Sequence, residues 1–220
     1  TSLGGSPMER WNPKDGDLYL NMVDKIHETG GRYAGVLWYQ GCSDTNPGPA
    51  EKYLEHFREY VEATRKELGY EIPFFTMQLN RQINGINDEC WGMVRDAQAR
   101  AAKEIPGVSV LTTSNLSLCD GIHNTAQANV ALGEKLAKQC AHVLNGKEEY
   151  QPPELVKVER ADEAERKSFQ LEGSGIWLKL TCDHVKNCFL VYSAVGKDSG
   201  FTLTDSEGEV EILHIRGNRE

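Results

Sequence analysis

Between Gly30 and Gly146 the chain alternates short apolar runs with longer segments of helical periodicity, and this alternation restricts its fold more than any other feature. The short runs are rich in aromatic and β-branched residues, as buried strands are. They cover Arg32–Gln40, Ile72–Leu79 and Val108–Thr113. The helical segments cover Pro49–Leu68, Glu89–Glu104 and Thr125–Leu144. Strands separated by helices of this length imply right-handed crossovers, so the sequence predicts an α/β fold with a mostly parallel sheet.

The order of these elements also indicates where a site would lie. In open parallel sheets the reactive groups collect in the loops beyond the carboxyl ends of the strands. We therefore expect functional side chains in the loops that follow the three predicted strands.

The pattern changes at Tyr150, where Gln151-Pro152-Pro153 is typical of a linker. Short apolar runs between Gly, Asn and Asp turns follow, without a helical pattern. These predicted strands are Ile176–Leu180, Phe189–Tyr192, Phe201–Leu203 and Val210–Ile215. We expect an α/β domain over residues 1–149 and a β-rich accessory segment over residues 150–220, incomplete because it stops abruptly.

Composition and charge argue against several classes of protein. With 39% hydrophobic and 26% charged residues the chain has an ordinary globular composition rather than a disordered one. The net charge of -9 and the lack of a basic stripe argue against nucleic acid and leave a neutral or polar small substrate. No apolar run is long enough to span a membrane, and no basic, apolar leader opens the chain. Because it opens on Thr1, we expect a mature, trimmed or partial chain.

The cysteines do not suggest a metal site. The sequence has six of them, with no CxxC pair and no Cys/His cluster at zinc spacing, so we expect no structural metal. Cys182 and Cys188 could close a small bridge across a hairpin, or all six could be buried thiols. The redox compartment therefore stays open.

Asp120 and His123 form the first candidate constellation, between the third predicted strand and the last predicted helix. An imidazole that acts as a general base needs a partner to hold its tautomer and stabilise the imidazolium, and an acid three residues earlier in a tight loop can serve. The alternative is an ordinary exposed loop histidine beside a chance acid. Spacing alone favours that alternative, whereas the position after a strand favours catalysis.

Two further segments could supply hydrogen-bond donors. Gln40 and Gly41 end the first predicted strand, and an amide with the backbone N–H groups behind it could stabilise an oxyanion. From these residues alone a polar turn at a strand end is the simpler interpretation. The Gly4-Gly5-Ser6 turn could also present backbone N–H groups, although a plain loop is the default.

Taken together and in order, four segments resemble the sialate O-acetylesterase group of carbohydrate esterases, a branch of the SGNH hydrolases. Ser2–Trp11 (SLGGSPMERW) resembles the family's Gly-Gly-Thr-Pro-x-Glu-x-Trp segment, and Gly35–Asp44 (GVLWYQGCSD) its Trp-Tyr-Gln-Gly-Glu-Ser-Asp block. Met93–Gln98 (MVRDAQ) resembles its Leu-Arg-Glu-Ala-Gln helix, and Asp120–His123 (DGIH) its Asp-x-x-His block. The resemblance covers Thr1 to about Gly146 in the correct order. It is therefore more specific than a match to any one of these motifs.

The resemblance implies a three-layer α/β/α SGNH-hydrolase domain of flavodoxin-like type, with a β-rich C-terminal appendage. It implies a serine-type carbohydrate O-acetylesterase that works through an acyl-enzyme and needs no metal or cofactor. His123 would be the general base and Asp120 its orienting partner, and Gly5 would donate its backbone N–H to the oxyanion. Gln40 and Gly41 would lie beside the same oxyanion hole. Family habit suggests a secreted or periplasmic protein acting on an acetylated carbohydrate, with no nucleic-acid or membrane partner.

Two departures from the family pattern leave alternatives open. The family's nucleophilic serine lies in a Gly-x-Ser-Asn turn upstream of the Gly-Gly block, so we expect it before Thr1. Cys42 stands where the family has Glu, and a thiol is a poor hydrogen-bond acceptor. Ser6 and Cys42 are weaker candidates for the nucleophile. An inactive or weakened carbohydrate-binding protein and a general acyl esterase are the rival functions, and the sequence does not choose among sialic acid, xylan and other glycans.

Overall fold

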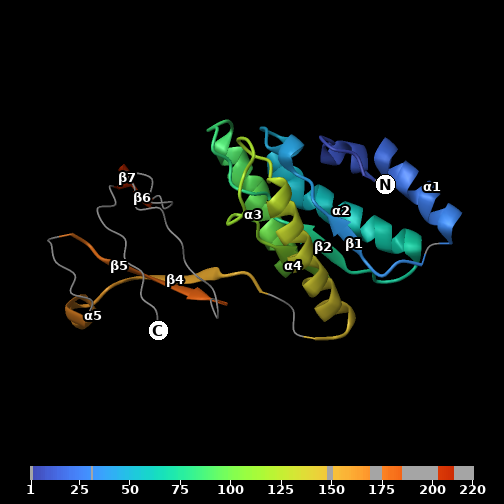
Figure 1. Ribbon diagram of the computed structural model, residues 1–220. Coiled ribbons are helices and arrows are strands. Elements are labelled where there is room, and N and C mark those ends of the chain that lie inside the picture. The colour runs from blue at the N-terminus through green and yellow to red at the C-terminus, as the bar shows by residue number, and fades with distance from the viewer. Residues whose placement is uncertain (1, 31, 148–150, 169–174, 185–202, 211–220) are drawn as a thin grey trace. The chain divides into compact units, whose positions relative to one another are not determined.

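The computed structural model describes residues 2–30, 32–147, 151–168, 175–184 and 203–210. The chain divides into two compact units, Thr1–Pro152 and Pro153–Glu220, and each is described by itself (Figure 1).

The first unit is an α/β structure built on a parallel sheet, as the alternating pattern predicted. Its strands pair in the order β1-β2-β3, with Val36 opposite Phe74 and Phe74 opposite Val108. The strands are β1 (Val36–Trp38), β2 (Phe74–Met77) and β3 (Val108–Leu111). The helices are α1 (Asp17–Thr29), α2 (Pro49–Leu68), α3 (Asp88–Glu104) and α4 (Ala126–Leu144), with short 3-10 turns η1 (Met8–Trp11) and η2 (Cys42–Asp44).

Local signals account for the helix ends. Pro49 occupies the first turn of α2, where its missing N–H costs nothing, and Gly69 ends that helix with φ of +75°. Thr125 caps α4, since its Oγ1 accepts a hydrogen bond from Ala128 N at 3.1 Å. The strands are shorter than predicted, and the residues after Trp38 leave the ladder to form a polar loop. Helix α1 was not expected from the sequence, and it buries Tyr19 and Ile26, which lie about two helical turns apart.

The core of this unit lies on both faces of the sheet. Because side chains alternate along a strand, Phe74 and Met77 of β2 point to opposite faces. Phe74 joins an aromatic cluster with residues of α2, in which Trp38 and Tyr60 have ring centroids 4.6 Å apart. Met77 joins a smaller cluster with Leu132 of α4. Helices α2 and α4 therefore hold the strands, and so their carboxyl ends, in fixed positions.

The second unit contains an antiparallel pair, β4 (Glu154–Arg160) with β5 (Leu178–Asp183), and a second pair, β6 (Leu203–Asp205) with β7 (Gly208–Val210). The expectation of no helix here is wrong, because α5 covers Glu163–Ser168. A capping box explains it: Asp162 Oδ1 accepts from Glu165 N at 2.8 Å, and Glu165 Oε2 accepts from Asp162 N at 3.1 Å.

Only some of the predicted C-terminal strands can be compared. The run Ile176–Leu180 contributes to β5, which starts and ends later than predicted. Phe189–Tyr192 and the greater part of the two later runs lie outside the described residues.

The described cysteines are all free thiols, and Cys119 and Cys182 are exposed rather than buried. Cys188 lies outside the described residues, so a bridge to it stays a prediction. Among the helices that the structure describes, none combines the length and apolarity needed to cross a membrane.

Candidate functional site

The loop between β3 and α4 presents Asp120 and His123 at the tip of a narrow turn. Its two sides are joined by hydrogen bonds from Cys119 N to His123 O at 2.9 Å and from Thr125 N to Ser117 O at 3.0 Å. At the tip, Asp120 Oδ1 accepts from His123 N at 2.7 Å, and Asp120 Oδ2 lies 2.7 Å from His123 Nδ1. One carboxylate thus orders the turn with one oxygen and contacts the imidazole with the other.

This geometry favours an ionised Asp120 beside an accessible imidazole. Hydrogen bonds from the backbone N–H groups of His123 and Ile122, and then from the His123 ring, lower the pKa of Asp120 to about 2. The His123 side chain is 64% exposed, so a reacting group can approach it. With Nδ1 against Asp120, Nε2 is the nitrogen left to exchange a proton with that group. The pair can therefore act as a base with its orienting acid.

The loop after β1 has its polar groups turned inward instead. Gln40 Nε2 donates to Ser6 O at 2.9 Å and to Asp44 Oδ2, while Tyr53 Oη donates to Gln40 Oε1 at 3.1 Å. Asp44, only 3% exposed, also accepts from Met8 N at 3.0 Å. Both amide hydrogens of Gln40 already have acceptors, so donation to an oxyanion would require one of them to be released.

Gly41 is needed in this loop for two reasons. Its φ of +140° is disfavoured for residues with a side chain, and an added Cβ would lie 3.0 Å from both Gln98 Nε2 and Val94 Cγ1. Gln98 on α3 is buried and bridges two strand ends, since it donates to Gln40 O at 2.9 Å and accepts from Leu79 N at 2.8 Å. Gln98 thus supports the β1 loop from α3. Arg95 on the same helix donates to the Leu79 carbonyl.

The N-terminal segment lies against the β1 loop through Ser6. Gly5, exposed and with φ of +68°, precedes Ser6, whose carbonyl accepts from Gln40. The Ser6 hydroxyl is buried, donates to Leu3 O at 2.9 Å and accepts from Trp11 Nε1 at 3.0 Å. These contacts give Ser6 a structural role.

Cys42 is partly buried at the start of η2. Burial, followed by the negative charges of Asp120 and Asp44, raises the pKa of its thiol. A nucleophilic cysteine needs the opposite environment, one that stabilises the thiolate, so this position disfavours Cys42 as a nucleophile.

Two asparagines that the sequence analysis did not identify connect the strand-end loops. Asn124, the residue after His123, donates from Nδ2 to Tyr39 Oη at 3.1 Å, and its Oδ1 accepts from Asn80 Nδ2 at 2.7 Å. The structure thus brings the loop with Gln40 and Gly41 beside the loop with Asp120 and His123. The available signal was position, because Asn80 directly follows the second predicted strand.

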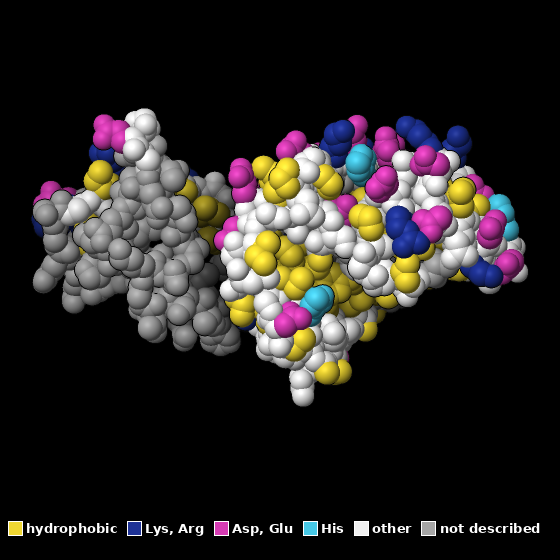
Figure 2. Space-filling model, turned by 90° about the horizontal axis from the view of Figure 1, so that it is seen from above, with side chains coloured by type: hydrophobic (Ala, Val, Ile, Leu, Met, Phe, Trp, Pro, Cys, Tyr) yellow, Lys and Arg dark blue, Asp and Glu magenta, His cyan; other side chains and the backbone are white. Residues whose placement is uncertain are grey.

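Figure 2 shows one face of the molecule, on which hydrophobic side chains gather beside a histidine that has an acidic side chain next to it. A site at such a place can combine apolar contacts with proton transfer.

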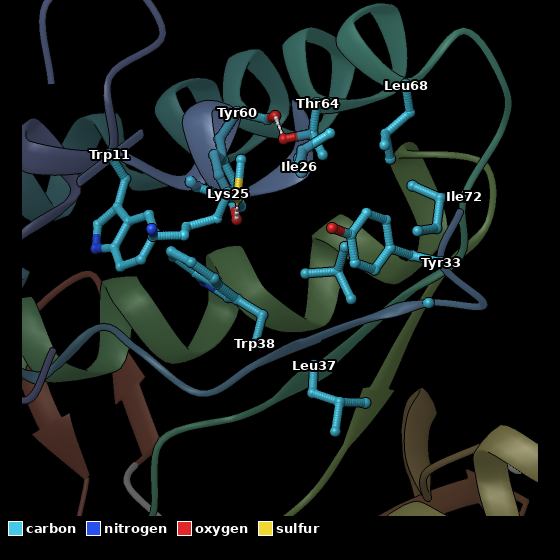
Figure 3. A pocket seen from close by; sticks show the side chains of 13 residues that line it. Trp11, Lys25, Ile26, Tyr33, Leu37, Trp38, Tyr60, Thr64, Leu68 and Ile72 are labelled. Carbon is cyan, nitrogen blue, oxygen red and sulfur yellow. Dashed lines mark hydrogen bonds between the residues drawn. The ribbon is translucent and has the colours of Figure 1, made fainter. Parts of the chain in front are cut away.

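A separate groove follows the outer edge of β1, between α1 and α2 (Figure 3). Its walls include Tyr33, Leu37, Trp38 and Tyr60, and none of the predicted site residues lines it. Within the described residues β1 pairs with β2 alone, which leaves this edge open, and no group of His, Cys, Asp and Glu side chains there is arranged to hold a metal.

Comparisons with known proteins indicate the family of the chain. The family model described as "Carbohydrate esterase, sialic acid-specific acetylesterase" matches residues 1–142. A protein of Arabidopsis thaliana named a probable carbohydrate esterase is 30% identical over 141 residues, which are 61% of this chain and 51% of that protein. The chain therefore spans about half the length of this relative.

Two solved structures are similar to the chain. A crystal structure of a protein from Arabidopsis thaliana has a TM-score of 0.55 at 28% identity, covering 63% of this chain and 57% of that one. The structure described as a novel carbohydrate acetylesterase from Xanthomonas citri has a TM-score of 0.60 at 25% identity, covering 71% of this chain and 39% of that one.

Proposed function

The chain belongs to the carbohydrate esterase family of sialic acid-specific acetylesterases, as its motifs predicted, and from this premise we propose that it carries the general base of a serine-type carbohydrate O-acetylesterase. The observation that carries the proposal is the contact of 2.7 Å between Asp120 Oδ2 and His123 Nδ1, made in a loop beyond the carboxyl end of β3. An imidazole held in one tautomer by an ionised carboxylate is the base that acyl transfer needs.

In the proposed reaction His123 moves the proton at each step. Its Nε2 takes the proton of a serine hydroxyl as the serine oxygen attacks the acetyl carbonyl, and Asp120 stabilises the resulting imidazolium. When the tetrahedral intermediate collapses, His123 gives that proton to the leaving sugar oxygen. His123 then deprotonates a water molecule, which attacks the acyl-enzyme, and acetate leaves as the proton returns to the serine.

Gly5 is the proposed backbone donor to the oxyanion, and Gln40 and Gly41 complete that side of the site. Both amide hydrogens of Gln40 already have acceptors, and one of these is Ser6 O. The proposed role of Gln40 is therefore to fix the backbone of Ser6, the residue that follows Gly5. Preorganised backbone donors of this kind are worth about 10²- to 10³-fold in rate each.

The nucleophilic serine is proposed to come from a segment upstream of Thr1. The open edge of β1 supports this, because β1 pairs with β2 alone among the described strands and the groove of Figure 3 runs along it. A further parallel strand there would end beside the loop after β1, where the serine is required. Apolar clusters on both faces of β2 likewise support the proposed three-layer SGNH arrangement.

The proposed substrate is an acetylated sugar, either sialic acid or a xylan-like glycan, handled without a metal or cofactor by a secreted or periplasmic protein. The β-rich segment from residue 150 onward is proposed to be accessory to the domain over residues 1–149. Acetate release from acetylated xylan and from O-acetylated sialic acid would distinguish the two substrates.

The test uses the full-length protein and a fluorophosphonate probe, which labels an activated serine. We expect His123→Ala to abolish labelling and acetate release together. His142→Ala, which changes another exposed histidine of the same unit, is the matched control and should leave both unchanged. Unimpaired turnover in His123→Ala would exclude this assignment.

A non-catalytic carbohydrate-binding protein is the second candidate, and the observation that favours it is Cys42 in place of the family's Glu. It requires sugar binding without acetate release by the unmodified protein. A general acyl esterase would instead prefer longer acyl chains, which a series of nitrophenyl esters would reveal.

A further inference from the structure

The loop that carries Asp120 and His123 is held at both ends by one buried side chain, Asn80, which is 1% exposed. Its Nδ2 donates to Leu116 O at 3.3 Å, where the loop begins, and to Asn124 Oδ1 at 2.7 Å, where it ends. A single amide group therefore closes the base of the loop whose tip bears the candidate base.

Asn80 is itself held firmly. Its side-chain Oδ1 accepts from Arg81 N at 2.8 Å. Its backbone carbonyl accepts from Nε1 of Trp91 at 2.7 Å, and Trp91 lies on the buried side of α3. Both hydrogens and the oxygen of the amide are thus used. A fully bonded buried amide resists displacement, because moving it would leave polar groups without partners.

Asn80 affects the position of His123 through Asn124, the residue that follows His123 in the chain. Asn124 also donates to Tyr39 Oη and to Asn129 Oδ1, each at 3.1 Å, so it contacts the end of β1 and the start of α4. Since Asn124 and His123 share a peptide bond, a shift of Asn124 moves the imidazole relative to the β1 loop.

We propose that Asn80 is a positioning residue for His123, an inference that rests on the proposed function of His123 as general base. Asn80 acts through Asn124 and touches no reacting atom. It sets the distance between the imidazole and the oxyanion side of the site. A misplacement of about 1 Å can cost an enzyme roughly 10²-fold in rate, so a small shift at the base of this loop matters.

The kinetic test is a double-mutant cycle in the full-length enzyme with Asn80→Ala, Asn124→Ala and the double variant. We expect each single change to lower kcat by about 10- to 100-fold while KM stays within about twofold. Because both remove the same hydrogen bond, the double variant should be little slower than either. Asn145→Ala is the matched control, since it removes an asparagine side chain that donates to Ala141 O at the C-terminal end of α4, and it should leave kcat unchanged. Additive losses would overturn the proposal.

A second measurement does not depend on turnover. In the 220-residue chain, ¹⁵N NMR of the histidine rings should show altered His123 signals in Asn80→Ala and Asn124→Ala, with His142 unchanged. If Asn80→Ala does not fold, the Asn124 variant still decides the question. Lower thermal stability with unaltered His123 signals and kcat would mean a merely structural role and would overturn the proposal. If the unaltered enzyme releases no acetate, the proposed function fails while the NMR result still stands by itself.

Discussion

The loops after β1 and after β3 follow the two strands that flank β2 in one sheet, yet they use the same kind of group in opposite ways. Each has an aspartate that accepts a backbone N–H. Asp44 is 3% exposed and ties the chain to Met8 and Gln40. Asp120, with a side chain 51% exposed, closes a local turn and orients His123.

This difference indicates that the two loops have different roles in the candidate site. The β1 loop is a rigid wall, because its polar groups are bonded to each other and to α3. The β3 loop presents the candidate pair Asp120 and His123 to solvent and takes its rigidity from Asn80 and Asn124 below it. A site that must hold one partner still while another exchanges protons is expected to have such a supporting shell.

Among the variants that test this difference between the loops, Asp120→Asn is expected to have the largest effect. The amide cannot hold the His123 tautomer as a carboxylate does, so kcat/KM in the full-length enzyme should fall by roughly 10³- to 10⁴-fold. The free energy of unfolding should change little, because the carboxylate is exposed. Ester turnover and urea denaturation measure the two quantities. Retained activity would show that Asp120 only shapes the turn.

For Asp44→Ala the main expected effect is on stability. The change leaves the buried Met8 N–H and a Gln40 amide hydrogen without their acceptor, which should lower the free energy of unfolding by about 3 kcal/mol. Urea denaturation measures this loss, with Asp120→Ala as the exposed counterpart that should lose clearly less. Equal losses in the two variants would remove the distinction between the loops.

Gly41→Ala tests the packing of the same wall. The positive φ and the contacts 3.0 Å away, to Gln98 Nε2 and Val94 Cγ1, should together cost about 2 kcal/mol of unfolding free energy. Gly4→Ala is the control, since its added Cβ would meet no atom within 4 Å and its φ is not in the left-handed region. A Gly41→Ala protein as stable as the control would mean that the β1 loop adapts freely.

The smallest expected effect is a difference in titration between the two aspartates. Hydrogen bonds lower the pKa of Asp120 to about 2, while burial raises the pKa of Asp44 above 3.8 despite the hydrogen bonds it accepts. The stabilisation that ionised Asp120 provides is therefore present above pH 3.8 and lost as the pH falls through about 2. For Asp44 the sign is reversed, because stability should rise as the pH falls through its raised pKa toward 3.8. As the pH is lowered, carboxyl ¹³C NMR should show that Asp44 is protonated before Asp120. The reverse order would contradict this account.

The sequence by itself determined the features that depend on neighbouring residues. Proline and glycine marked the ends of α2, and apolar periodicity located α2, α3 and α4. Asp120 and His123 could be paired because three residues of a turn bring them together whatever surrounds them. Even α5 follows from a local signal, the capping box from Asp162 to Glu165, although the surrounding strand-like runs concealed it.

Only the tertiary structure decided which strand-end residues meet. Asn80 and Asn124 are 44 residues apart, and Ser6 and Gln40 are 34 apart. Their contacts depend on sheet register, on the crossovers that set strand order, and on how far each strand extends before its loop begins. These are set by packing of the two apolar clusters over the whole unit. Local patterns therefore identified the candidate pair Asp120 and His123, while the contacts of the β1 loop and those of Asn80 and Asn124 required the folded sheet.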